Sequence, residues 1–172
     1  MRAETNKLSY IFNGQRILRI PFFQRSYVWG EDEWKRLLSD LVEKQQEFEP
    51  GRPHELKFMG ALIFKQEITA TSSFGDVRIL VDGQQRLTTM VVLMKVLSLK
   101  KGISEKFDRQ FKDSSDRIVI EHNLHDLDDF KMLMQLKSLE GNEMVGGRIV
   151  ELFNFLKNSH QLDLLDWDFV LN

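Results

Sequence analysis

Two short segments of this 172-residue chain gather the side chains that could bind a phosphate. In the second of them, Asp82 to Thr89, a glycine stands between a predicted strand and a predicted helix. A helix start presents backbone N–H groups without intrahelical partners, and the helix dipole favours negative charge there. Gly83 permits a positive φ or a close approach by a ligand. This order of elements predicts an anion site with phosphate as its natural guest.

The side chains of this second box suit that chemistry. Its two glutamines can each donate two hydrogen bonds, and its arginine offers a bidentate fork to a phosphate or carboxylate. Two threonines add hydroxyls, and the aspartate at the strand end could hold a metal ion or orient an attacking water. These residues are Asp82, Gln84, Gln85, Arg86, Thr88 and Thr89.

A purely structural interpretation of the second box stays open. Asp82 and Gln85 have the spacing of a capping box, which stabilises a helix by about 1 kcal/mol without any function. Arg86 fits that interpretation poorly. A cation in the first helical turn opposes the dipole by about 0.3 to 1 kcal/mol, so its presence is better explained by a neighbouring anion.

The first box, Ile20 to Trp29, packs four aromatic residues, a glutamine and an arginine into ten positions. It could be a core corner whose aromatic side chains fill space. Alternatively, Gln24 and Arg25 face a nucleotide or a phosphodiester, with an aromatic ring available for base stacking. The dipeptide Gln-Arg occurs in both boxes. If the two pairs converge in space, they form a clamp for a polyphosphate.

The elements around the boxes are predicted from periodicity and turn residues. Before the second box, the sequence predicts a helix ended by Gly14, with a hairpin turn at Asn13-Gly14 as the alternative. After it the sequence predicts a half-buried strand, an amphipathic helix from Asp32 and a hairpin in the core. The first strand of this hairpin is almost continuously apolar, as expected for a strand that is covered on both faces. The strands are expected at Arg16 to Ile20, Leu56 to Lys65 and Val77 to Val81, and Gly83 leads into a helix of about four turns.

Beyond this helix the pattern is more polar. Lys100 to Ser115 interleaves both signs of charge and is expected to be a solvated loop. Arg117 to Glu121 can form one more strand, and Asp126 to Leu139 and Glu143 to Lys157 are expected to be helices. Asp163 to Val170 is too short to assign. Together these elements predict an α+β fold. It consists of a small mixed or antiparallel sheet flanked by helices, with further helices toward the C-terminus.

Composition excludes several classes of protein. The chain has no cysteine, which rules out disulfides, thiolate zinc sites and a cysteine nucleophile. Its 24 Lys and Arg against 26 Asp and Glu argue against a polybasic nucleic-acid coat. We expect no secretory signal and no membrane span, since no apolar stretch reaches the about 20 residues that a bilayer needs. A cytoplasmic protein fits best.

Other site motifs are missing or weak. Neither a P-loop nor a dinucleotide-binding glycine motif is present, so any nucleotide must be held by a different cradle. His122 and His125 lie near Asp126, Asp128 and Asp129, but acidic residues just before a helix are expected to cap it rather than bind metal.

Together the two boxes resemble a known family. Ile20-Pro21-Phe22-Phe23-Gln24-Arg25-Ser26-Tyr27-Val28-Trp29 and the Asp82-Gly83-Gln84-Gln85-Arg86 segment resemble paired motifs of the N-terminal domain of GmrSD-type, modification-dependent restriction systems and related phage-defence proteins. The Phe58-Met59-Gly60 step matches as well, and Glu121-His122-Asn123 with Asp126 to Phe130 resembles a weaker later segment. The resemblance implies a fold similar to ParB and sulfiredoxin, with nucleotide binding and hydrolysis that control DNA cleavage.

The resemblance also implies roles for residues. Asp82, Gln85 and Arg86 would be catalytic, with Asp82 also holding Mg²⁺. The nucleotide would be bound by Gln24, Arg25, Gly83, Gln84, Thr88 and Thr89. Residues 1–115 would form the nucleotide-binding core and residues 116–172 a strand and helical extension. A C-terminal nuclease domain of the longer protein would cut DNA, with modified DNA as the expected target, and a homo-oligomer is left open.

The sequence therefore predicts a Mg²⁺-dependent hydrolase of GTP or ATP that regulates restriction. One alternative is a module that binds a phosphodiester or a modified base of DNA without turnover. Another is an interaction domain whose boxes only organise the core. The sequence does not reveal which nucleotide or which DNA modification is recognised.

Overall fold

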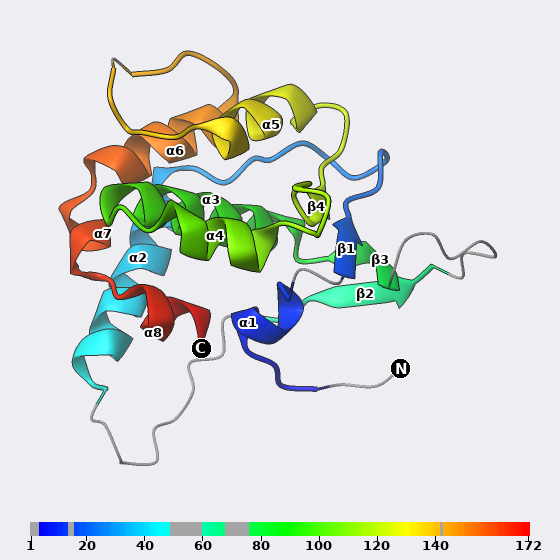
Figure 1. Cartoon of the computed structure of the whole chain (residues 1–172), viewed down its shortest axis with the longest axis horizontal. Helices are drawn as coiled ribbons and strands as arrows, with labels where there is room; N and C mark the ends of the chain where they lie inside the picture. The colour runs from blue at the N-terminus through cyan, green and yellow to red at the C-terminus, as the bar shows by residue number, and fades with distance from the viewer. Residues whose placement is uncertain (1–3, 14–15, 49–59, 68–75, 142) are drawn as a thin grey trace.

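The computed structural model describes residues 4–13, 16–48, 60–67, 76–141 and 143–172. These residues form an α+β fold in which a four-stranded mixed sheet is flanked by helices, as the sequence predicts (Figure 1). The strands are β1 (Arg16–Arg19), β2 (Ile63–Gln66), β3 (Asp76–Asp82) and β4 (Ile120–Glu121). The helices are α1 (Leu8–Ile11), α2 (Glu31–Gln46), α3 (Gln84–Lys100), α4 (Ser104–Phe111), α5 (Leu127–Gln135), α6 (Arg148–Asn158), α7 (His160–Leu164) and α8 (Trp167–Leu171).

The sheet has the order β2-β3-β1-β4, with β1 parallel to both β3 and β4 and with β2 antiparallel to β3. The antiparallel pairing of β2 with β3 confirms the predicted hairpin. However, β2 is an edge strand in this order, and Lys65 and Gln66 are exposed. The expectation of a strand covered on both faces is wrong over 63–65, because Phe64 packs against the core while Lys65, on the opposite face, is exposed. Residues 56–59 lie outside the described part.

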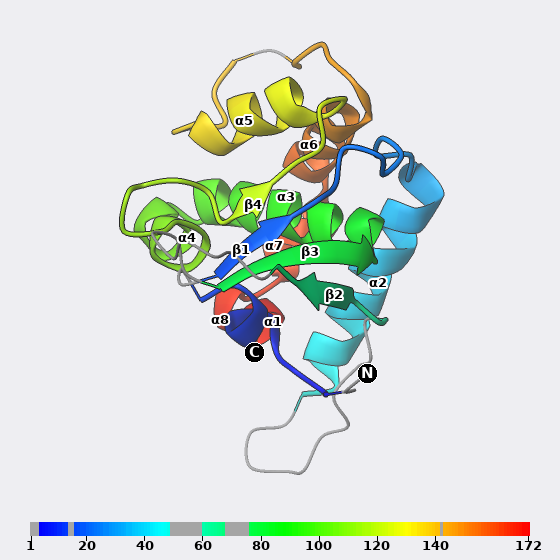
Figure 2. The same cartoon turned by 90° about the vertical axis from the view of Figure 1, so that its right-hand side faces the viewer.

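Helix α3 is the centre of the fold and lies behind the sheet in Figure 2. Nearly all of its residues from Gln84 to Ser98 are buried, so it is covered on every side rather than along one face. A helix that is apolar all round is buried all round. Helices α4 and α6 pack against it, and the buried residues Leu18, Ile20 and Leu80 bring the sheet into the same core.

Helix α4 corrects the expectation of a solvated loop between Lys100 and Ser115. It spans Ser104–Phe111, and both Phe107 and Phe111 are fully buried. The two rings stack with centroids 4.6 Å apart. Their spacing of four residues places them on one face of the helix. Burial of these two apolar side chains determines the local structure although most residues around them are charged.

The remaining elements agree in kind with the predictions but are shorter. Helix α1 confirms the helical interpretation of the first segment, whereas Gly14 lies outside the described residues. The strand predicted over Arg117 to Glu121 keeps two residues. Helix α5 falls within its predicted range, whereas α6 starts later than predicted and ends one residue beyond the predicted end. The unassigned C-terminal stretch contributes α8, which contacts α1.

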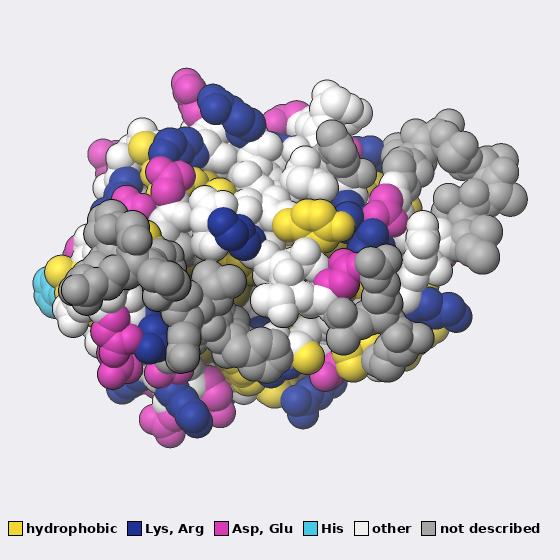
Figure 3. Space-filling view, turned by 90° about the horizontal axis from the view of Figure 1, so that it is seen from below, with side chains coloured by type: hydrophobic (Ala, Val, Ile, Leu, Met, Phe, Trp, Pro, Cys, Tyr) yellow, Lys and Arg dark blue, Asp and Glu magenta, His cyan; other side chains and the backbone are white. Residues whose placement is uncertain are grey.

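Charges on the surface are mixed. Figure 3 shows lysines, arginines and acidic residues interspersed on one face of the molecule. No helix in the described ranges has the length and apolarity to cross a bilayer. The division of the chain at residue 115 stays a prediction. Across it, β4 pairs with β1 and α6 packs against α3.

Candidate functional site

The two boxes meet at one cavity, so the condition for a shared clamp, convergence of the two Gln-Arg pairs, is met. This box cavity has a volume of about 180 Å³. Its lining consists of Gln24, Arg25 and Trp29 from the first box and Asp82, Gly83, Gln84, Gln85 and Arg86 from the second. Segments that are almost 60 residues apart in the sequence therefore form a single site.

The floor of the box cavity is the start of α3. Strand β3 ends at Asp82, Gly83 takes a φ of 94°, and the helix begins at Gln84. No side chain in the described ranges caps this helix, and Asp82 Oδ1 accepts from the adjacent N–H of Gly83 at 2.8 Å. The capping-box interpretation of Asp82 and Gln85 is therefore wrong. The N–H groups of the first turn stay available to an anion.

Two glycines allow the segment 60–62 to pack closely against this helix start. A Cβ on Gly83 would lie 2.4 Å from Leu62 Cδ2 and 2.9 Å from the carbonyl oxygen of Ala61. A Cβ on Gly60, whose φ is 103°, would lie 2.8 Å from Nε of Arg86. The segment 60–62 thus packs directly over the helix start and against the arginine of the second box.

Gln85 ties the two boxes together. Its Oε1 accepts from the backbone N–H groups of Val28 at 2.8 Å and Trp29 at 3.2 Å. Its Nε2 donates to the carbonyl of Ser26 at 3.3 Å. Both ends of this buried amide are therefore occupied by the backbone of the first box. Its hydrogen bonds hold the loop in place and leave little capacity for a ligand.

Gln84 differs from its neighbour. Its side chain is 4% exposed, and Nε2 donates to the carbonyl of Arg25. Its Oε1 is buried and has no hydrogen-bond partner among the described residues. Buried polar atoms are usually satisfied in native proteins, so an unpaired acceptor in a cavity wall indicates a group that a ligand could satisfy.

The two arginines at the box cavity have different environments. Arg86 Nη2 donates to the carbonyl of Ala61 at 2.7 Å, while its buried Nε has no partner in the part of the chain that the structure describes. Arg25 is exposed, and within the described residues neither guanidinium forms an ion pair with a carboxylate. Asp82 is exposed at the rim. The lining therefore carries two positive charges and one negative charge.

Thr88 and Thr89 lie behind the cavity rather than in its lining. Thr89 Oγ1 lies 2.7 Å from the hydroxyl of Tyr27 and donates to the carbonyl of Gln85. The indole N–H of Trp34 donates to the same Tyr27 hydroxyl at 2.8 Å. Burial raises the pKa of Tyr27 to about 12. These side chains fasten the first box to α3 and α2 from within the core.

A third segment, 122–126, supports the site from the other side. Thr88 Oγ1 lies 2.9 Å from Nε2 of His122, whose Nδ1 accepts from the N–H of Asn123. Nε2 therefore carries the proton of a neutral ring, in keeping with the burial that lowers the pKa of His122. Asp126 Oδ2 accepts from Tyr27 N at 2.8 Å.

Two features of the 122–126 segment differ from the predictions: Asp126 has another role than the expected helix cap, and the support that the segment gives to the first box was not predicted. The carboxylate of Asp126 does not cap α5 but binds the backbone of the first box. No group of acidic, histidine or cysteine residues suited to a metal occurs in the described ranges. The partial match at Glu121-His122-Asn123 was the signal that could have drawn attention to this segment.

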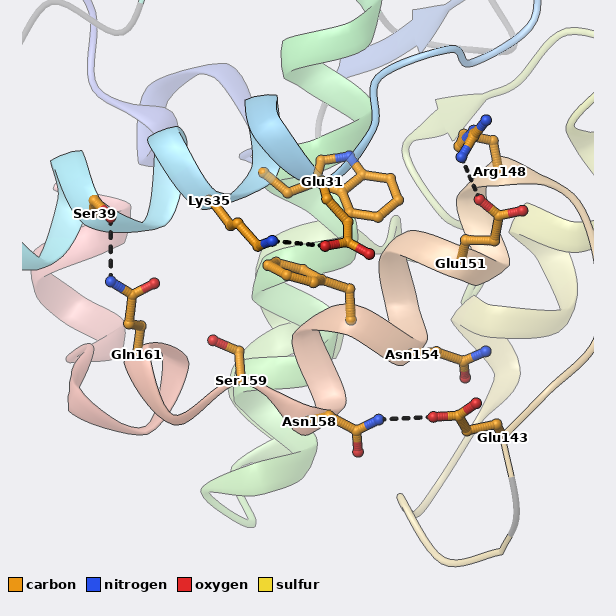
Figure 4. Close-up of a pocket in the computed structure, with 12 residues that line it drawn as sticks. Glu31, Lys35, Ser39, Glu143, Arg148, Glu151, Asn154, Asn158, Ser159 and Gln161 are labelled. Carbon is orange, nitrogen blue, oxygen red and sulfur yellow. Dashed lines mark hydrogen bonds and ion pairs between the residues drawn. The ribbon is translucent and has the colours of Figure 1, made fainter.

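A larger cavity, of about 800 Å³, lies between α2 and α6 (Figure 4). Sequence analysis gave no sign of it because its two walls are more than 100 residues apart. Most of its charged and amide side chains bind another side chain of the lining: Lys35 binds Glu31, Arg148 binds Glu151, Asn158 binds Glu143 and Gln161 binds Ser39. Such mutual pairing leaves this cavity less suited to an ion than the box cavity.

Comparison with known proteins agrees with the pattern of the two boxes. A family model described as GmrSD restriction endonuclease, N-terminal domain, matches residues 8–163. The matched range includes both boxes and the 122–126 segment. No curated protein matches the chain.

Proposed function

This chain belongs to the family of GmrSD restriction endonuclease N-terminal domains, and on that premise we propose that it binds a nucleoside triphosphate at the box cavity and hydrolyses it. Hydrolysis would regulate cleavage of DNA by the full-length restriction protein. The substrate would be GTP or ATP, with Mg²⁺. DNA would be a partner of the full-length protein, whose nuclease domain would lie outside this sequence.

One observation carries this proposal: several kinds of unpaired donor face the same small volume. The uncapped start of α3 supplies backbone N–H groups, and Arg25 and Arg86 supply guanidinium groups. A phosphate bound there would satisfy the backbone donors and pair with the guanidinium groups of Arg25 and Arg86. It would also offset the unfavourable position of Arg86 in the first helical turn.

The volume of the cavity suits one end of a nucleotide. Sites for drug-sized ligands usually measure about 300 to 1,000 Å³, whereas the box cavity measures about 180 Å³. We therefore place the phosphates inside it and the base outside. Trp29 lines the cavity and is partly exposed, so its ring could stack on the base.

The free hydrogen-bonding capacity of each side chain suggests its role. Both ends of the Gln85 amide are bonded to the first box, so we assign it to positioning of that box and assign the contact with the attacking water or the ribose to Gln84. Arg25 and Arg86 would stabilise the negative charge that develops as the γ-phosphate is transferred to water. Thr88 and Thr89 would support the site without touching the nucleotide.

Asp82 suits Mg²⁺ in chemical type. It presents an exposed carboxylate at the cavity rim, and Mg²⁺ is commonly held by one or two carboxylates together with substrate phosphates and water. The absence of a multi-carboxylate cluster from the described residues is compatible with that mode of binding. When bound, the ion would neutralise phosphate oxygens and fix their orientation.

Thermal shift and phosphate release test the proposal. MgATP or MgGTP should raise the melting temperature of the chain saturably, and Arg25→Ala or Arg86→Ala should weaken binding by about 10- to 100-fold. Arg25 is exposed, so its variant should keep the fold; Arg36→Ala, exposed on α2, is the matched control. Wild-type protein that responds to neither nucleotide, or site variants that respond like Arg36→Ala, would contradict nucleotide binding.

A second candidate is a DNA-binding module without turnover, and the exposed aromatic tip of the first box favours it. Phe22 and Phe23 are 75% and 74% exposed, with ring centroids 5.6 Å apart in an edge-on arrangement. They directly precede Gln24 and Arg25, so rings for stacking and a cation for phosphate lie together. This candidate requires DNA binding that weakens with salt in the absence of nucleotide and is reduced in Phe22→Ala.

A further inference from the structure

The position of Arg25 is set by its backbone. Its side chain is exposed and forms no ion pair with the described residues, so no side-chain partner orients it toward the cavity. Its carbonyl, in contrast, accepts from two buried amides. These are Nε2 of Gln84 and Nδ2 of Asn123, the latter at 3.1 Å.

Asn123 reaches more of the first box than this one carbonyl. Its Nδ2 also donates to the carbonyl of Gln24 at 3.2 Å, so one amide group spans two successive peptide units. On the other side of this loop, Nε2 of Gln24 donates to the carbonyl of Val81 at 3.0 Å. The tip of the first box is therefore held between β3 and the 122–126 segment.

Asn123 is itself fixed in orientation. It is 2% exposed, and its Oδ1 accepts from the N–H of Asp126 at 3.2 Å. That contact requires the oxygen to face Asp126 and therefore turns the NH₂ group toward Gln24 and Arg25. The carboxylate of Asp126 also binds Tyr27 N, so the same segment holds the first box on both sides of Arg25.

We infer that Asn123 is a positioning residue that holds Arg25 at the mouth of the box cavity. It is absent from the cavity lining and acts through the backbone of Gln24 and Arg25. The part of this inference that concerns a ligand rests on the proposed nucleotide function. The part that concerns the loop does not, and it can be tested separately.

Native-state proteolysis tests the loop. Trypsin cleaves after Arg25 when the first box opens locally, and Asn123→Ala should raise that cleavage rate about tenfold, as expected for the loss of one or two net hydrogen bonds. Asn123→Asp keeps the acceptor for Asp126 N and removes the donor, so it should act similarly if the alanine variant folds poorly. The matched control is Asn154→Ala, because Asn154 likewise binds a backbone N–H and a carbonyl, those of Met144, which belongs to neither box. Equal cleavage after Arg25 in the Asn123 variants and wild type would overturn the inference.

A double-mutant cycle tests the link to the ligand, with MgATP and MgGTP as probes. Asn123→Ala should weaken binding and raise KM about tenfold in the wild-type background but have little further effect in Arg25→Ala, because both variants remove the same interaction. An equal loss in both backgrounds would show that Asn123 acts on the fold in general and would overturn the positioning role. If wild type binds neither nucleotide, the proposed function fails, while the proteolysis result still decides whether Asn123 holds the loop.

Discussion

The dipeptide Gln-Arg occurs twice in this protein, and its two copies have different structural environments. In the first box it lies on a loop, where Gln24 makes one side-chain hydrogen bond and Arg25 is exposed. In the second box it lies in the first turn of α3, where Gln85 makes three hydrogen bonds and Arg86 is braced by Ala61. Identical residue types thus give a rigid half and a more accessible half of one site.

This difference has a physical origin. The second box is part of the central helix and inherits its burial, whereas the first box has no regular structure and depends on side chains from elsewhere to hold its backbone. Those side chains come from α3 and from the 122–126 segment. Binding residues on a loop can adapt to a ligand, provided that a rigid scaffold positions the loop.

The largest loss of stability is expected at the start of α3. Gly83→Ala should lower the free energy of unfolding by about 4 kcal/mol, since it combines a left-handed backbone with overpacking. The matched control is Gly102→Ala, which has a positive φ of 64° but no atom within 4 Å of the added methyl group. It should cost about 1 to 2 kcal/mol. Urea denaturation measures both, and equal losses would show that close packing at Gly83 is unimportant.

The next test compares the two glutamines directly. Gln85→Ala should destabilise the protein by about 3 kcal/mol because it leaves backbone groups of Val28, Trp29 and Ser26 without partners. Gln24→Ala should cost about 1 kcal/mol or less, since it loses one hydrogen bond from a partly exposed side chain. Denaturant unfolding measures both losses of stability. Similar losses in the two variants would show that the two glutamines do not differ in their structural importance.

The alkaline pH dependence of stability should separate the two halves. Burial lowers the pKa of Lys95, on α3, to about 8. The unfolded chain therefore binds more protons between about pH 8 and 10.4, so stability should rise over that window. Burial raises the pKa of Tyr27, in the first box, to about 12, so stability should fall between about pH 10 and 12.

Each slope should reach about 1 kcal/mol per pH unit at most. Urea titrations at a series of pH values should show the rise disappear in Lys95→Met and the fall disappear in Tyr27→Phe. If Tyr27→Phe keeps the fall, another group is responsible for it.

The smallest effect is expected at the arginines without ligand. Arg86→Ala should lower stability by about 1 kcal/mol, because it loses the hydrogen bond to Ala61. Arg25→Ala should change it by less than about 0.5 kcal/mol, as for other exposed positions. Melting temperatures of the two variants check this difference. A larger loss in Arg25→Ala would mean that its side chain holds the first box.

Local residue order was enough to predict several parts of this molecule. Gly83 after Asp82, followed by the apolar run of α3, marked the strand-to-helix junction because a turn and a helix period are local signals. The two boxes were visible for the same reason. The spacing of Phe107 and Phe111 is also a local signal for a helix, but the charged residues around the two rings favoured the prediction of a loop.

Tertiary structure alone decided which of these side chains are free. Gln84 and Gln85 are equivalent in sequence, yet their orientations on the helix direct one amide to three backbone groups and leave the other with an unpaired oxygen. The support from Asn123 comes from a segment almost 100 residues away. Sequence spacing carries no information about such distant hydrogen bonds, because packing of the whole chain determines which groups meet.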